Sequence, residues 1–227
     1  DSDSFIKLVQ FNQGQVYAKQ QGEPAGRRLL QEISGSFAVT PQIETGFAFS
    51  ASIADGPPNL IFRGMIDLKE QVLDTLSIRA NYVLNQNLRI FDSTLVELQG
   101  GNLVADLHLS GPVELGDIDL MGSMRLRDGQ LAVRNRQFVL ENVNIIAEIS
   151  GDSIRVLQGT CDLNDAPLQI TGHLAHAVYG PRSVELSIFS EKFAPEQFVR
   201  RLFPGTEIPL RGSGELQLQA YGPLLQP

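Results

Sequence analysis

The sequence has no tryptophan, one cysteine among 227 residues, and fewer basic residues (18) than acidic ones (26). A lone Cys161 excludes an intramolecular disulfide and a cysteine-based zinc cluster. The net charge of −8 makes nucleic acid an unfavourable partner and provides no broad basic surface for anionic lipids. No stretch approaches about 18 consecutive apolar residues, so we expect no membrane-spanning helix.

We expect no signal peptide within this sequence, because it opens on Asp1-Ser2-Asp3-Ser4 and not on a basic and then apolar segment. The last residues, Leu225-Gln226-Pro227, and the first ones look like cuts in a longer chain. We therefore expect residues 1–227 to form a single continuous segment of a larger protein.

What the sequence does contain is period-two alternation. Hydrophobic residues make up 42% of the chain, and in many short segments they occupy every second position. Met124 and Leu126, for example, alternate with Arg125 and Arg127. Such a segment is an extended strand with one apolar and one polar face. The chain holds roughly a dozen segments of this kind, so we predict an all-β protein.

Turn signals separate the predicted strands. Asp128-Gly129, between two alternating runs, is the strongest hairpin signal, and Gly100-Gly101 and Gly151-Asp152 are further breakers. Two segments favour short helices. Residues 195–203 begin with a proline and carry an apolar stripe, whereas residues 25–33 are the weaker candidate because Gly26 lowers helicity.

The fold predicted from these signals is a long curled amphipathic sheet, a half-pipe groove, with one or two short helices. Its apolar face must be hidden from water. One interpretation is a dry core, in which two halves of the sheet cover each other. The other is a groove lined by Leu, Ile, Val, Phe, Met and Ala, which suits an alkyl chain because each buried methylene contributes roughly 0.8 kcal/mol.

No catalytic or metal-binding constellation emerges from the residues. His173 and His176 are three apart, so in a strand they point to opposite faces and cannot chelate one metal together. Cys161 is interpreted as a small buried hydrophobe. Nucleophile elbows, Walker loops and Rossmann fingerprints are missing. We expect no enzyme activity and no cofactor. Turn chemistry explains an acidic cluster that lacks the spacing of a known calcium loop: Asp152, Asp162 and Asp165.

A family resemblance rests on residues 87–90, 101–112, 120–131 and 136–145, and on the later segments 152–163 and 168–174. These segments resemble the repeated strand pattern of the translocation and assembly module B (TamB) and AsmA-like proteins. The pattern combines a Leu-x-Leu-x-Gly strand, a Gly-bounded hairpin and a strand that begins with Phe. The match covers about residues 75–190, and residues 1–70 fit by strand pattern alone.

The resemblance implies a taco-shaped, hydrophobic-lined sheet in the periplasm or cell envelope of a diderm bacterium, with relatives in chloroplasts and a full-length protein anchored in the inner membrane. It implies phospholipid transport between inner and outer membranes, with acyl chains as the bound partner. It also implies an outer-membrane β-barrel protein as a further partner, and it brings no enzyme signature.

The residues expected to line the groove are the alternating apolar ones, whose role would be nonspecific solvation of hydrocarbon. A β-bulge near Asn142 would change which residues of that strand share a face. The expected lining consists of Leu103, Leu107, Leu109, Met124, Leu126, Phe138, Leu140, Val143, Ile145, Leu168, Ile170, Val184, Leu186, Leu216 and Leu218.

Two alternatives belong to other functional classes. Exposed sheet edges could template client strands by β-augmentation during assembly of outer-membrane β-barrel proteins. A polysaccharide-processing enzyme on a β-helix would need a polar cleft with clustered carboxylates, which sequence spacing does not reveal.

Overall fold

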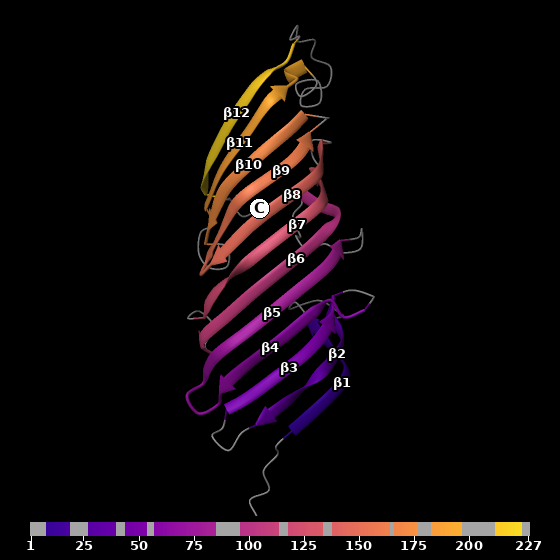
Figure 1. Ribbon diagram of the computed structural model, residues 1–227, viewed down its shortest axis with the longest axis vertical. Coiled ribbons are helices and arrows are strands. Elements are labelled where there is room, and N and C mark those ends of the chain that lie inside the picture. The colour runs from indigo at the N-terminus through magenta and orange to yellow at the C-terminus, as the bar shows by residue number, and fades with distance from the viewer. Residues whose placement is uncertain are drawn as a thin grey trace, which may run out of the picture. The chain divides into compact units, whose positions relative to one another are not determined.

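The computed structural model describes residues 8–18, 27–39, 44–53, 57–84, 96–113, 118–133, 138–163, 166–176, 183–196 and 212–223. These residues form twelve β-strands in one antiparallel sheet, and the strand order follows the chain order from β1 to β12. Figure 1 shows each strand beside the next one along the chain. The all-β prediction and the expected number of strands are confirmed.

The strands have the following bounds: β1 Leu8–Ala18, β2 Arg27–Val39, β3 Glu44–Ser52, β4 Leu60–Asp67, β5 Val72–Leu84, β6 Val96–Pro112, β7 Asp119–Val133, β8 Phe138–Ser150, β9 Ser153–Leu163, β10 Ala166–Ala175, β11 Ser183–Phe193 and β12 Gly214–Pro223.

The chain divides into two compact units. Unit 1 comprises Asp1–Tyr82 and Val104–Gly122, and unit 2 comprises Val83–Leu103 and Ser123–Pro227.

Short polar connections hold the hairpins of unit 1. Between β4 and β5, the Asp67 carboxylate accepts hydrogen bonds from the backbone N–H groups of Lys69 (2.8 Å) and Glu70 (2.9 Å). The turn closes at Gln71, whose φ of 55° is left-handed. Asn59, just before β4, bonds through its side chain to the N–H and C=O of Ile53. These side chains satisfy backbone groups that the strand ladders leave unpaired.

The predicted helix over residues 25–33 is wrong, because its described part is the start of β2. The helix-like spacing of Leu30 and Ile33 has a local cause. Their partners on β1, Val16 and Gly14, are two apart, so β2 contains an extra residue here. Glu32 adopts a left-handed φ of 52° between them. A β-bulge therefore gives apolar residues a spacing of three without a helix.

Two predicted breakers also lie inside strands. Asp128-Gly129 falls within β7 and Gly100-Gly101 within β6. Asp128 has a φ of 50°, the left-handed conformation that a hairpin turn needs, but here it kinks a continuous strand. By contrast, Gly151-Asp152 forms the predicted tight turn between β8 and β9.

The predicted helix over residues 195–203 begins as expected, since Pro195 and Glu196 are helical. Its remaining residues, 197–203, lie outside the described part of the chain.

Glycines allow close strand packing beside large side chains in unit 1. Gly35 of β2 pairs with Phe49 of β3, and Gly64 of β4 pairs with Phe47. A Cβ atom at Gly35 would lie 2.6 Å from Phe49 Cα, and one at Gly64 would lie 2.6 Å from Phe47 Cζ. Both distances are too short for carbon atoms, so a side chain at either position would force the strands to shift.

We predict that Gly35→Ala lowers the free energy of unfolding by about 1–3 kcal/mol, because the added methyl group overpacks the β2–β3 contact. Urea titration followed by circular dichroism measures this change. Gly46→Ala is the matched control, since its Cβ would be 4.0 Å from the nearest atom that it meets. Equal stability of the Gly35 variant and the parent chain would contradict the packing argument.

Candidate functional site

The register of β8 to β12 places many apolar residues of unit 2 on one face. Residues paired across two antiparallel strands point to the same side of the sheet. Leu168 pairs with Cys161, and Ile170 pairs with both Gly159 and Ile188. Leu186 pairs with Gly172 and Ala220. We call this surface the aliphatic face. It contains nine of the predicted lining residues: Leu140, Val143, Ile145, Leu168, Ile170, Val184, Leu186, Leu216 and Leu218.

A β-bulge at Asn142 keeps β8 in phase with this face. Glu141 pairs with Asp162 and Asn144 with Thr160, so β8 has one residue more than β9 in this interval. Asn142 has a left-handed φ of 50°. The structure contains a bulge at Asn142, which explains why Leu140 and Val143, three apart in sequence, share a face.

Side-chain hydrogen bonds stabilise the bulge. Asn142 Nδ2 donates to Asp162 Oδ2 at 2.7 Å, and Asn144 Nδ2 donates to the Asn142 carbonyl at 2.7 Å. The backbone N–H of Asp128 in β7 donates to Asn144 Oδ1 at 3.2 Å. The bulge and the kink in β7 are therefore linked by one polar network, and the acidic residue Asp162 has a structural partner there.

Burial falls along the aliphatic face towards β12. Val143 in β8 is 1% exposed and Leu168 in β10 is 4% exposed, whereas Leu218 in β12 is 42% exposed. Leu216 in β12 and Val184 and Leu186 in β11 are partly exposed. The face is therefore closely packed around Val143 and Leu168, whereas Leu140, Ile145 and Ile170 remain partly exposed. At β11 and β12 it is mainly a solvent-accessible apolar surface.

The other predicted lining residues lie on β6, β7 and β8. Leu103 and Met124 of unit 2 are partly exposed, and Leu126 is buried at 7% exposure. Leu107 and Leu109 belong to unit 1 and are partly exposed. Phe138 starts β8, but its side chain lies outside the described part of the structure.

Unit 1 has an apolar face of its own that the sequence did not reveal as a site. The Phe11 ring lies 5.6 Å from the Phe37 ring, and the Phe49 ring lies 4.5 Å from the Phe62 ring, nearly parallel to it at 17°. Phe47 joins Phe37 and Phe49, with ring centroids 6.2 and 6.0 Å away. We call these five residues the phenylalanine ladder.

The ladder crosses four strands, β1 to β4. Period-two alternation identifies Phe47 and Phe49 as neighbours on one face, but the other three rings come from strands whose register the sequence does not state. Phe37 is 38% exposed, so the ladder also presents apolar surface to solvent.

Titratable groups do not assemble into a reactive centre in the described residues. His173 sits on the face opposite Leu174, paired with Arg155 and Glu185, while His176 Nδ1 lies 3.3 Å from Asp152 Oδ2. Among these residues, no three His, Cys, Asp or Glu side chains are placed to hold a metal ion.

Burial raises the pKa of the Cys161 thiol from 9.0 to about 11, and the neighbouring Asp162 charge adds to the shift. The thiol is 2% exposed on the aliphatic face. Only the thiolate is a good nucleophile. The raised pKa keeps the thiol protonated and burial limits access to it, so both slow its reaction with a reagent.

We predict that native Cys161 reacts with an aromatic disulfide reagent on the order of 100-fold more slowly at about pH 8 than in the urea-unfolded chain. The neutral thiol stabilises the fold fully below pH 9, and this contribution is lost as the pH rises through about 11. Cys161→Ala should therefore lose less stability over that interval. Rapid labelling of the native chain would contradict the buried placement.

Tyr82 is a second buried titratable group, in β5 of unit 1. The residue is 4% exposed, its hydroxyl has no hydrogen-bond partner among the described residues, and burial raises the pKa of the phenol. An unpaired buried hydroxyl costs free energy.

We predict that Tyr82→Phe raises the free energy of unfolding by about 1 kcal/mol, because it removes the unpaired group and keeps the ring. Thermal melting measures the change. Tyr221→Phe serves as the control, since Tyr221 is 87% exposed. A loss of stability in the Tyr82 variant would show that the hydroxyl has a partner.

Comparisons with known proteins add no relative: no family model, no curated protein and no solved structure matches this chain. In the part of the chain that the structure describes, no helix is long and apolar enough to cross a bilayer.

Proposed function

We propose that this chain is a segment of a hydrophobic conduit that binds lipid acyl chains and carries phospholipids between the inner and outer membranes of a cell envelope, as its resemblance to TamB and AsmA-like proteins implies. The observation that carries the proposal is the aliphatic face. It continues over five neighbouring strands and remains solvent-accessible at β11 and β12.

The chemistry of the face suits hydrocarbon. The side chains that β10, β11 and β12 contribute to it are mostly aliphatic. The polar exception is Ser190 of β11, which pairs with Leu216 and is 1% exposed. Leu218, Leu216 and Leu186 can exchange contact with water for contact with methylene groups, at about 25 cal/mol per Å² of apolar surface buried. The opposite face of β12 presents Gln217 and Gln219 and would stay in water.

In the proposed mechanism the protein acts passively. Acyl chains slide along the apolar floor while head groups remain hydrated beyond it. Dispersion and hydrophobic contacts are non-directional, so no position along the face holds the chain more tightly than its neighbours. The phenylalanine ladder offers unit 1 a comparable apolar surface. No reaction and no cofactor is required for this step.

We predict that Leu218→Glu reduces the phospholipid bound to the purified chain at least about fivefold, because the variant places a charge on the apolar face. Native mass spectrometry counts the bound phospholipid, and transfer of a fluorescent phospholipid between vesicles measures the activity. Leu218 is 42% exposed, so the fold should tolerate the charge, and circular dichroism checks this.

The matched control is Gln219→Glu, which adds the same charge one residue away on the opposite face. It should bind phospholipid as the parent chain does. Equal losses in both variants would point to the net charge and not the face. A parent chain that neither retains nor transfers phospholipid would overturn the proposal.

A second candidate function is the scaffold for assembly of outer-membrane β-barrel proteins. What favours it is β12, which pairs with β11 alone among the described strands and contains no lysine or arginine. Charged residues normally protect such an edge from pairing with another chain. Here prolines in β12 should abolish activity while Leu218→Glu leaves it intact, the reverse of the conduit's expected behaviour.

A further inference from the structure

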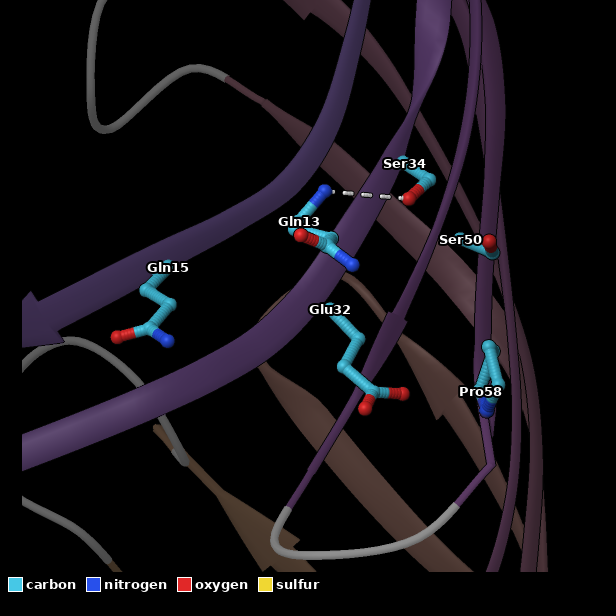
Figure 2. A pocket seen from close by; sticks show the side chains of 6 residues that line it. All are labelled: Gln13, Gln15, Glu32, Ser34, Ser50 and Pro58. Carbon is cyan, nitrogen blue, oxygen red and sulfur yellow. Dashed lines mark hydrogen bonds between the residues drawn. The ribbon is translucent and has the colours of Figure 1, made fainter.

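A polar pocket of about 550 Å³ opens in unit 1, at β1, β2, β3 and the segment before β4. Figure 2 shows Gln13 and Glu32 directed towards a space that Ser50 and Pro58 bound on the other side. The volume lies within the range of small-molecule sites, about 300–1,000 Å³. The described lining consists of Gln13, Gln15, Glu32, Ser34, Ser50 and Pro58.

The pocket is separate from the proposed lipid surface. Ser34 pairs with Ser50, and the adjoining pair is Gly35 with Phe49. Successive residues of a strand point to opposite faces. The two serines therefore lie on the face opposite the phenylalanine ladder, so an alkyl chain on the ladder would not enter the pocket.

Two irregular residues build the pocket. Gln13 and Glu32 have left-handed φ values of 55° and 52°, which residues other than glycine adopt only uncommonly. Each lies where the β1–β2 or β2–β3 register shifts, and the Gln13 N–H donates to Ser34 Oγ at 3.4 Å. Glycine would fit both backbone conformations with less strain. Strained residues of this kind cluster at functional sites, and here both side chains enter one cavity.

The chemistry of the lining selects a class of ligand. Two amides and two hydroxyls can each donate and accept hydrogen bonds, and Glu32 carries the only formal charge among the described lining residues. Without a cation, the lining does not suit a phosphate or a carboxylate. A single carboxylate is too few for a calcium site. The mixed donors and acceptors of the lining suit a ligand rich in hydroxyl groups.

An exposed aromatic ring adjoins these polar groups. The Tyr17 hydroxyl donates to Gln15 Oε1 at 2.5 Å, and Tyr17 is 58% exposed. A ring held in this way offers an apolar surface on which the C–H face of a sugar can pack, while the carboxylate of Glu32 accepts from neighbouring hydroxyls. We propose that this pocket binds a neutral carbohydrate.

The test titrates the whole 227-residue chain with two neutral oligosaccharides, maltotriose and tri-N-acetylchitotriose, and follows backbone NMR shifts. Saturable shifts at β1 to β3 are expected with at least one of them. Glu32→Gly and Gln13→Gly keep the left-handed backbone and remove the side chain, so each should weaken binding at least roughly tenfold without loss of stability. Gln71→Gly is the control, since Gln71 has the same φ of 55° but lies in the β4–β5 turn outside the pocket.

Three outcomes would overturn the proposal: no saturable binding of either oligosaccharide, undiminished binding by both glycine variants, or an equal loss in the Gln71 variant. Choline and inorganic phosphate are run in parallel, and saturation by one of these ions alone would also overturn it. The proposal does not rest on the conduit function, because Glu32→Gly should retain phospholipid while Leu218→Glu should retain the sugar.

Discussion

Cross-strand register is the constraint on which the rest of this structure depends. Side chains alternate strictly along a strand, so a slip of one residue would turn every apolar side chain of that strand to the other face. In unit 2 two strands contain an extra residue, β8 at Asn142 and β9 between Val156 and Gln158. At each of these points the alternation of apolar residues also skips one position, so the apolar side chains before and after it stay on the same face. The aliphatic face is continuous because these irregularities match.

The same constraint gives unit 1 two dissimilar faces. Glycines opposite Phe47 and Phe49 let the strands approach, and the rings then stack from strand to strand. On the reverse side, the bulges at Gln13 and Glu32 shift the strand register beside a polar pocket. A bulge thus serves two purposes here, since it preserves the register of an apolar face and also directs polar side chains into a common space.

Local sequence patterns were sufficient to predict most strands. They failed where the same backbone conformation occurs in two different structures. A left-handed residue followed by glycine occurs both in hairpin turns and within irregular strands. The prediction of a hairpin turn at Asp128-Gly129 is therefore wrong, since both residues lie within β7. Leu30 and Ile33, three apart, resemble a helical stripe because the bulge at Glu32 lies between them. In both places the pairing with neighbouring strands, which contributes far more than local propensity, decided the outcome. The strand around Asn142 alternates clearly on both sides, but only its pairing with β9 showed that a bulge lies there.

Alternation by itself determined that this chain is all-β and that each strand has one apolar face, because the pleat converts every second position into one surface. Composition by itself indicated that most of the apolar side chains would be aliphatic. Only the tertiary structure decided which side chains of different strands share a surface. Five phenylalanines gather from four strands, Leu218 is exposed, and Gln13 meets Glu32 at one pocket. Each of these depends on the register between strands. Register is set by contacts between strands, and no single strand's sequence contains them.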